Sequence, residues 1–138
     1  PHSVVSGQTA ARRLFADCKA EEINYYEKHG DFPIMHVVAI RQSLLEKEPW
    51  VAKAAFDMFN QAKELAETLY EDPNWSRLAW GRHYFEEERT LFVDDPWGNG
   101  FKRNKANIER FIKYSHDQGL IDAIYPAESL FTETTLDT

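Results

Sequence analysis

Five side chains are of types that could bind or protonate a small ligand. His36 lies in an apolar run, where an imidazole needs hydrogen-bond partners or a ligand, and it could act as a general acid or base. Arg41, at the end of that run, could bind a carboxylate through two parallel hydrogen bonds. Asp94, Asp95 and Trp97 lie in a loop rich in glycine and proline, a kind of segment that often carries binding groups. The indole could stack on an aromatic ligand there.

Three of these residues also have a structural explanation. His36 could be a core histidine bonded to a backbone carbonyl, and Arg41 could be a solvated residue at the end of a strand. Trp97 could equally fill a space in a neighbouring lobe of the protein. The residue types alone therefore indicate an aromatic, histidine-containing cleft and leave its use open.

Metal and cofactor signals are weak. His83 and Glu87 are four positions apart, as in part of a metal site, but no third ligand is recognisable and the adjacent glutamates are typical of a solvated face. His116 and Asp117 lie in the last turn of a predicted helix, where an imidazolium suits the helix dipole. Cys18 has no histidine beside it and is expected to be a structural thiol. With no glycine-rich phosphate loop, G-x-S-x-G or CxxC in the sequence, we predict no metal and no cofactor.

The segment that carries His36 predicts a buried strand. Residues 32–41 form a short apolar run rich in β-branched residues, and Gly30, Pro33 and Arg41 bound it. The run does not alternate polar and apolar residues, so we expect both faces to be covered, as in an α/β sheet. One strand leaves unpaired edges, and further strands are therefore expected outside this sequence.

Helical patterns dominate the rest of the chain. Between Trp50 and Tyr70 apolar residues recur in steps of three and four, which is typical of an amphipathic helix. Ser43 and Glu46 have the spacing of a capping box. Further helices are predicted over residues 21–28, about 81–92, 101 to Gly119, and 126–131. One face of the helix that starts at residue 101 carries Phe101, Asn104, Ile108, Phe111, Ile112 and Ser115. The predicted fold class is helix-rich α/β.

Composition excludes several classes of protein. The chain has 138 residues, 43% of them apolar, which excludes an intrinsically disordered chain. No stretch approaches the roughly 18 uncharged apolar residues of a membrane span. A net charge of −7 with scattered basic residues argues against a nucleic-acid partner, and the single cysteine excludes an internal disulfide.

The two ends of the sequence carry little pattern. Residues 1–11 are small and polar, and residues 132–138 predict a loose tail. The chain opens with Pro1 and shows no signal-peptide pattern. We therefore expect residues 1–138 to be a single domain or a fragment of a larger protein.

Four short motifs resemble the C-terminal part of 4,5-dihydroxyphthalate decarboxylases. The first is Phe32-Pro33-Ile34-Met35-His36-Val37-Val38, with Tyr25-Tyr26 before it and Pro49-Trp50-Val51-Ala52 after it. The second is Asp95-Pro96-Trp97-x-x-Gly100, which looks like that family's Asp-x-Trp-Pro-x-Gly loop. The third is Tyr114-Ser115-His116-Asp117-Gln118-Gly119-Leu120, which resembles its Gln-Gly-Leu helix end. The fourth is Glu128-Ser129-Leu130-Phe131, which resembles its terminal Glu-x-Leu-Phe. The resemblance runs from about Arg13 to the C-terminus. It departs from the family at Pro96, which precedes Trp97 instead of following it, and at Asn99, where an aromatic is common.

The resemblance implies a type II periplasmic-binding-protein-like fold, in which a ligand cleft lies between two α/β lobes. It implies that this sequence is the C-terminal portion and lacks the N-terminal lobe. The activity it implies is that of a carboxy-lyase acting on an aromatic dicarboxylate such as 4,5-dihydroxyphthalate. We expect the portion alone to be inactive, because the cleft needs both walls, and to self-associate through exposed strand edges. A cytoplasmic location is expected, or a periplasmic one if a signal peptide lies upstream.

Decarboxylation of such an acid needs a proton donor, a group that stabilises the phenol and a cation for the second carboxylate. By hypothesis, these tasks fall to His36, to Asp94 or Asp95, and to Arg41, with Trp97 stacking on the ring. The alternative is a non-catalytic solute-binding protein of an ABC-type transporter, because one scaffold serves both functions. A third possibility is a helical interaction module without a ligand cleft.

Overall fold

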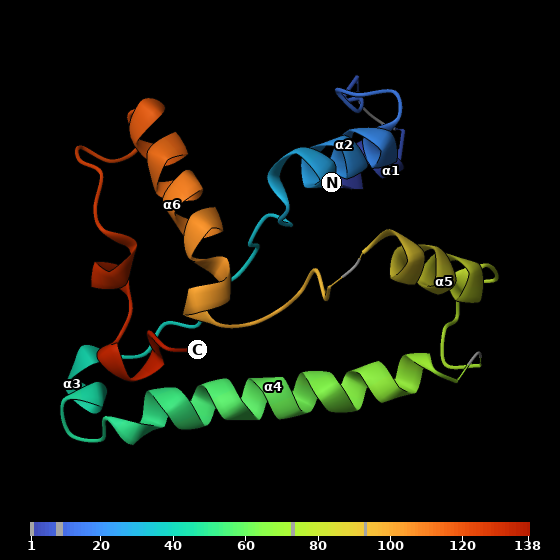
Figure 1. The fold of residues 1–138 in the computed structure, drawn as a ribbon. Helices are drawn as coiled ribbons and strands as arrows, with labels where there is room; N and C mark the ends of the chain where they lie inside the picture. Colours follow the sequence, from blue (N-terminus) through green and yellow to red (C-terminus); the bar gives the residue numbers. More distant parts are fainter. Residues whose placement is uncertain (1, 8–9, 73, 93) are drawn as a thin grey trace. The chain divides into compact units, whose positions relative to one another are not determined.

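The computed structural model describes residues 2–7, 10–72, 74–92 and 94–138. All regular secondary structure within these residues is helical, so the helix-rich part of the predicted fold class is confirmed (Figure 1). The elements are α1 (His2–Val5), α2 (Cys18–His29), α3 (Gln42–Leu45), α4 (Trp50–Tyr70), α5 (Gly81–Leu91), α6 (Phe101–Asp117) and the short 3₁₀ helices η1 (Ala127–Leu130) and η2 (Glu133–Thr135). The chain divides into two compact units, Pro1–Phe32 and Pro33–Thr138.

Local capping sets both ends of α2 in the first unit. The Asp17 side chain accepts a hydrogen bond of 3.0 Å from the backbone N–H of Ala20 and caps the start of the helix. Gly30 ends it in the left-handed conformation, at a φ of 72°, and donates its N–H to the Tyr26 carbonyl at 2.7 Å. The helix predicted to stop near Gly30 is confirmed, and the Asp17 cap moves its start to Cys18.

The helix α4 in the second unit has the bounds that the apolar periodicity predicts. Its sequence is amphipathic, yet Ala52 is its buried residue. Large side chains of the predicted inner face are exposed, among them Met58 at 60% and Leu65 at 67%. The prediction of the helix is confirmed, and its apolar face is largely uncovered in this structure.

The prediction of a buried strand over residues 32–41 is wrong. The segment has no regular secondary structure, and most of its side chains are exposed, including Met35 and Val37. A strand needs a neighbour to bond its N–H and carbonyl groups. The described residues form no strand that could pair with this run, and its side chains consequently face solvent.

The capping box predicted at Ser43 and Glu46 is also wrong. Ser43 lies inside α3, which starts one residue earlier with Arg41 as its N-cap and has no side-chain cap. The Gln42 side chain instead donates a hydrogen bond of 2.9 Å to the Glu46 carboxylate. The helix α3 is therefore stabilised by a bond between two side chains one turn apart, and its first backbone N–H groups have no side-chain cap.

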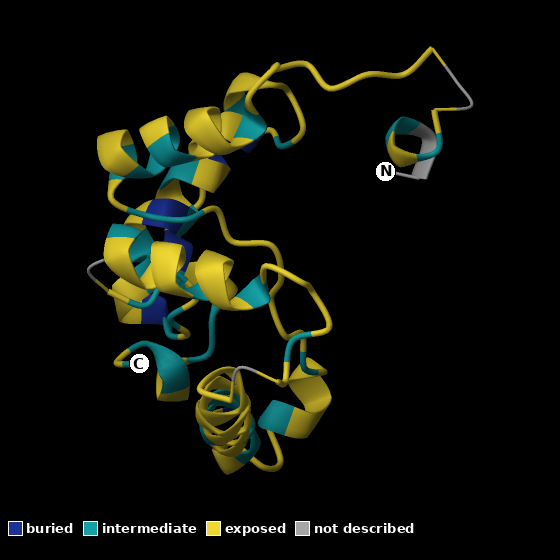
Figure 2. Ribbon diagram, turned by 90° about the vertical axis from the view of Figure 1, so that its right-hand side faces the viewer, coloured by how far each residue is buried: buried dark blue, intermediate teal, exposed yellow. Residues whose placement is uncertain are grey.

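The core of the second unit lies between α6 and η1. Phe101, Ile112 and Ala127 are buried together, and the rings of Phe101 and Phe131 pack with centroids 5.0 Å apart. Figure 2 shows few buried positions among the intermediate and exposed ones. On α6 the predicted inner residues Phe101, Ile112 and Ser115 are buried, whereas Phe111 is 68% exposed. The core face of α6 is thus narrower than the sequence pattern predicts.

Both ends of α6 are fixed by backbone bonds. At its C-terminus Gly119 has a φ of 70° and donates to the His116 carbonyl at 2.9 Å, while the Leu120 N–H reaches the Ser115 carbonyl at 2.9 Å. These two bonds form the Schellman arrangement, and the predicted helix end at Gly119 is confirmed. At its N-terminus the Lys102 N–H donates to the Thr138 carbonyl at 2.6 Å.

The C-terminal segment is more ordered than the loose tail expected for residues 132–138. It contains η2, and the Thr138 hydroxyl accepts the Phe101 N–H at 3.2 Å. Packing of η2 against α4 also places this segment beside the long helix. Among the described residues, none of the helices combines the length and the apolar character that a membrane crossing requires.

Candidate functional site

The loop between α5 and α6 contains a tight turn built from its own sequence. The Gly98 N–H donates to the Asp95 carbonyl at 3.3 Å, and the Trp97 N–H donates to Asp95 Oδ1 at 2.8 Å. Aspartate at the first position of a β-turn, proline at the second and glycine at the fourth are each favoured there. The order Asp95-Pro96-Trp97-Gly98 therefore folds locally into a turn whose third residue is Trp97.

Lys63 of α4 joins this turn to the long helix. Its Nζ donates to Asp95 Oδ2 and, at 2.9 Å, to the Trp97 carbonyl oxygen. Both backbone groups of Trp97 are thus bonded, the N–H to Asp95 and the carbonyl to Lys63. We call Lys63 and Asp95 the Trp97 clamp. The Lys63 side chain is 24% exposed and also lies 3.7 Å from Glu67, one helical turn further on.

A second bond links the far side of the loop to α4. The Asn99 side chain donates to Asn60 Oδ1 at 2.9 Å. Asn60 and Lys63 are three positions apart, which places them on one face of α4. The same helix face therefore holds the loop at two points.

The helix α6 holds the loop from its other end. The Arg103 guanidinium donates to the Asp95 carbonyl, and the Asn104 side chain donates to the carbonyls of Gly98 and Gly100 at 2.8 Å each. A Cβ atom on Gly98 would come within 2.3 Å of Arg103 Nε, so glycine leaves the space in which the guanidinium lies. Four side chains from two helices therefore hold residues 95–100 of this loop.

A small polar cavity lies beside this loop. Its volume is about 280 Å³. The residues that line it are Asn60, Lys63, Glu64, Glu67, Asp95, Gly98, Asn99 and Arg103. Cationic, acidic and amide groups thus meet in one hollow, and the clamp forms part of its wall.

The clamp sets the ionisation of Asp95. Burial raises the pKa of this carboxyl, but hydrogen bonds from Lys63 and from the Trp97 N–H lower it more, with help from the positive charges of Lys63 and Arg103. The net effect is a pKa below the ordinary value of 3.8. Asp95 is therefore an acceptor in its ionised form at neutral pH.

The structure brings together only some of the predicted site residues. Asp95 and Trp97 share the held turn, where the Trp97 residue is 54% exposed, and Asp94 lies exposed just before it. His36 and Arg41 are exposed within the irregular segment of residues 32–41, and neither side chain has a hydrogen bond or ion pair within the described chain. The expectation that His36 is buried is wrong, because the strand that would bury it does not form.

Sequence reasoning missed the groups that hold the loop. Lys63 and Asn60 have the appearance of solvated helix residues, and Arg103 that of a polar residue in the first turn of α6. Asn104 is placed by the sequence pattern on the inner face of that helix, with no role in holding the loop. Nothing in local patterning distinguishes Lys63 from other lysines of the chain, because its partners lie more than thirty positions away. The i, i+3 spacing of Asn60 and Lys63 does place two hydrogen-bonding side chains on one face of the helix, but it does not identify their partners.

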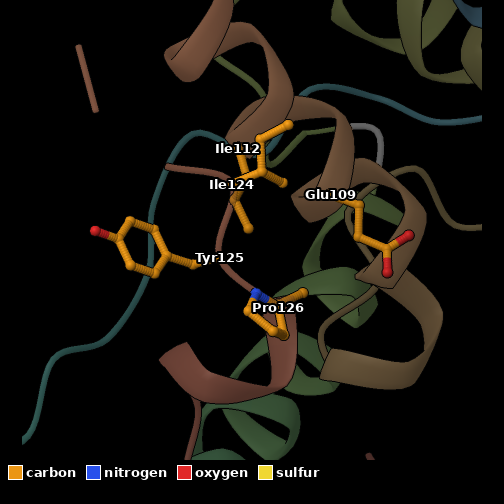
Figure 3. A pocket seen from close by; sticks show the side chains of 6 residues that line it. Glu109, Ile112, Ile124, Tyr125 and Pro126 are labelled. Carbon is orange, nitrogen blue, oxygen red and sulfur yellow. The ribbon is translucent and has the colours of Figure 1, made fainter. Parts of the chain in front are cut away.

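A second hollow lies between α6 and the segment that leads into η1. It has a volume of about 360 Å³ and is lined by Glu109, Ile112, Ile124, Tyr125, Pro126 and Ala127. In Figure 3 the Tyr125 hydroxyl points away from the isoleucines, and it donates to Asp122 at 2.8 Å, a bond that raises its pKa. An apolar hollow with a carboxylate at its edge does not suit an organic anion.

The titratable side chains of the described residues do not gather into a metal site. No group of three or more His, Cys, Asp and Glu side chains in that part of the chain is placed to hold a metal ion. The His83 ring packs 5.7 Å from the ring of Trp80. The aromatic contact gives this histidine a structural environment on α5.

The chain is similar to a protein of known activity. No protein family model matches it. It is 31% identical over 134 residues to a curated 4,5-dihydroxyphthalate decarboxylase of Comamonas testosteroni. The match covers 95% of this chain and 40% of the relative, so the chain spans about two fifths of the length of that protein. This coverage fits a correspondence to the C-terminal part of such a protein. The predicted resemblance to 4,5-dihydroxyphthalate decarboxylases is thereby confirmed along nearly the whole of this chain.

Proposed function

We propose that this chain is the C-terminal portion of a decarboxylase-like carboxy-lyase that acts on an aromatic dicarboxylate such as 4,5-dihydroxyphthalate. The observation that carries the proposal is the 31% identity to a decarboxylase across 95% of the chain. The held loop supports it, because the Asp-Pro-Trp motif of the resemblance has a defined local conformation and an exposed indole.

The reaction assigns a task to each candidate residue. When the bond between the ring and the carboxylate breaks, CO₂ leaves and the electron pair remains on the ring carbon, which takes up a proton. A hydroxyl para to that carbon accommodates electron density as CO₂ departs. We assign donation of the proton to His36, stabilisation of the phenol to Asp94, and binding of the second carboxylate to Arg41. Trp97 stacks on the ring, and Asp95 contributes through the conformation of the turn.

The proposal includes the rest of the fold. We infer that the chain is one part of a larger two-lobed α/β protein of the periplasmic-binding-protein-like type. The exposed apolar run at residues 33–41 supports this inference, because pairing with strands elsewhere in a longer polypeptide would bury it. In that setting His36 and Arg41 would lie at the edge of a sheet, close to a cleft.

The test uses the complete protein that contains this chain, mixed with phthalate-type acids. CO₂ release is measured together with binding by calorimetry. We expect turnover of 4,5-dihydroxyphthalate, and loss of at least about a hundredfold in kcat for His36→Ala. His83→Ala, which removes a histidine of α5 that has no assigned role in the reaction, is the matched control and should keep wild-type turnover.

Two outcomes would contradict the proposal in different ways. Binding of the acids without any CO₂ release would favour a solute-binding protein over an enzyme. Wild-type turnover and affinity in the His36→Ala variant would remove His36 from the mechanism and leave the decarboxylase assignment intact.

A further inference from the structure

Trp97 has a defined backbone orientation although it lies in a loop. Its N–H is bonded to Asp95 Oδ1 and its carbonyl to Lys63 Nζ, while Lys63 also bonds the other oxygen of the same carboxylate. These bonds close a ring of interactions through the two peptide groups that flank Trp97. With both peptide groups held, the direction of the Trp97 Cα–Cβ bond is set, and two side-chain torsions place the indole relative to that bond.

Lys63 differs from the other lysine of α4 that forms an ion pair. Lys53 pairs with Asp57 within one helical turn, and its side chain is 49% exposed. Lys63 reaches a carboxylate and a carbonyl more than thirty residues away in sequence, with half that exposure. A local pair stabilises a helix surface, whereas this contact connects the helix to a loop.

We propose that Lys63 is a positioning residue that orients Trp97 for stacking on the ring of the aromatic acid. This inference rests on the proposed function for the identity of the ligand, but the geometry of the clamp stands independently of it. Lys63 acts through Asp95 and the Trp97 carbonyl and makes no contact with substrate. Loss of its ammonium group frees one peptide group of the turn, and the indole then samples several directions.

The first measurement follows the loop without any ligand. Backbone hydrogen exchange of residues 95–100 is compared in the complete protein for wild type, Lys63→Met, Lys63→Arg and the control Lys53→Met. We expect exchange at Trp97 and Gly98 to rise about tenfold in Lys63→Met, because a charge-assisted bond is lost. Lys63→Arg should restore protection in part, and Lys53→Met should match wild type.

The second measurement separates positioning from general stability. For 4,5-dihydroxyphthalate we expect Lys63→Met to raise KM about fivefold to tenfold with kcat changed less than twofold, because stacking acts on bound substrate. Trp97→Leu should raise KM to a similar extent, and adding Lys63→Met to it should have little further effect. Lys53→Met should leave both parameters unchanged.

Each of the two measurements has outcomes that would overturn the inference. Unchanged loop exchange in Lys63→Met would overturn the inference, and so would faster exchange with an unchanged KM. Additive effects of Lys63→Met and Trp97→Leu on KM would also overturn it. A wild-type protein that neither binds nor decarboxylates these acids would contradict the proposed function, and the exchange result would still decide whether Lys63 holds the turn.

Discussion

The Asp95 carboxylate, a candidate for binding a ligand, is bonded to groups of the protein itself. One of its oxygens accepts the Trp97 N–H, the other accepts the Lys63 ammonium, and its carbonyl accepts Gly98 and Arg103. A carboxylate bonded at both oxygens is costly to recruit for another partner. Its contribution to a binding site is therefore to the shape of the turn.

The ionisation of Asp95 leads to a pH-dependent prediction. Because its folded-state pKa lies below 3.8, its stabilising effect is complete above the unfolded-state value and is lost as the pH falls through the lowered pKa. Asp95→Asn should lower the free energy of unfolding by on the order of 0.5 kcal/mol at pH 7, since the pair is partly exposed. That difference should shrink below about pH 4, as measured by urea unfolding at a series of pH values.

Lys63→Met provides the control for this titration. Without the ammonium partner, the loss of stability caused by Asp95→Asn should be smaller at pH 7 and vary less with pH. A loss that grows as the solution becomes acidic would contradict the assigned direction of the pKa.

The site could be predicted from sequence only where its contacts are local. The Asp95-Pro96-Trp97-Gly98 order predicts a turn because each residue suits its position through its own backbone. Lys63 could not be assigned, since nothing in an amphipathic pattern tells which solvated lysine meets a distant carboxylate. Apolar neighbours predict a core position for His36, and those neighbours are themselves exposed here.

At the scale of elements, the helix α6 shows which of its features the apolar periodicity predicts and which it does not. Its start, its Gly119 end and the burial of Ile112 follow from the sequence. The pattern places Phe111 on the same face, but this residue is exposed, because η1 and its flanking residues cover only a narrow strip of the helix. The width of a buried face depends on what packs against it and is not contained in the helix itself.

Substitution of these neighbours on α6 should have very different effects. Ile112→Ala removes a buried side chain from the cluster with Phe101 and Ala127, and we expect it to lower the free energy of unfolding by about 2–4 kcal/mol. Phe111→Ala removes an exposed ring and should cost less than about 0.5 kcal/mol. Chemical denaturation of the two variants checks both values. Equal losses would show that Phe111 is packed in solution.

The two glycines that flank α6 provide a second matched pair. Both have positive φ, at 115° for Gly100 and 70° for Gly119. A Cβ at Gly100 would lie 2.7 Å from the backbone carbon of Thr138, whereas at Gly119 it would meet nothing within 4 Å. We expect Gly119→Ala to cost about 1 kcal/mol through backbone strain alone, and Gly100→Ala to cost roughly 2 kcal/mol or more because the C-terminal segment must also move.

Thermal unfolding measures the order of these two losses. Limited proteolysis near residue 138 should be faster than in the wild type for Gly100→Ala only. That variant loosens the contact of Thr138 with the first turn of α6. A larger loss for Gly119→Ala would contradict the close approach of the C-terminal segment.

At the scale of the whole molecule, the limit of sequence reasoning lies in strand pairing. The run at residues 33–41 has the composition of a buried strand, and composition predicts what a segment can do when it has neighbours. No neighbouring strand exists in the described chain, so the same residues lie irregular and exposed. Helices such as α4 form from local bonds and match the sequence pattern even where their apolar face is uncovered.

The uncovered apolar surface leads to a prediction about the isolated chain. Met58 and Leu65 on α4, together with Met35 and Val37, expose large apolar side chains to solvent. Patches of this kind drive association unless they are covered. We expect the isolated 138-residue chain to show a mass by light scattering that rises with concentration, in spite of mutual repulsion from its net charge of −7.

Two single substitutions on α4 separate apolar burial from charge. Leu65→Lys removes an exposed apolar side chain and Gln61→Lys removes an exposed polar one, while each adds one positive charge and so weakens the repulsion between copies equally. We therefore expect Leu65→Lys to reduce association and Gln61→Lys to leave it unchanged or raise it slightly. If apolar contacts hold the copies together, only the first variant moves the mass towards that of a monomer. A wild-type chain that remains monomeric at every concentration would contradict this prediction.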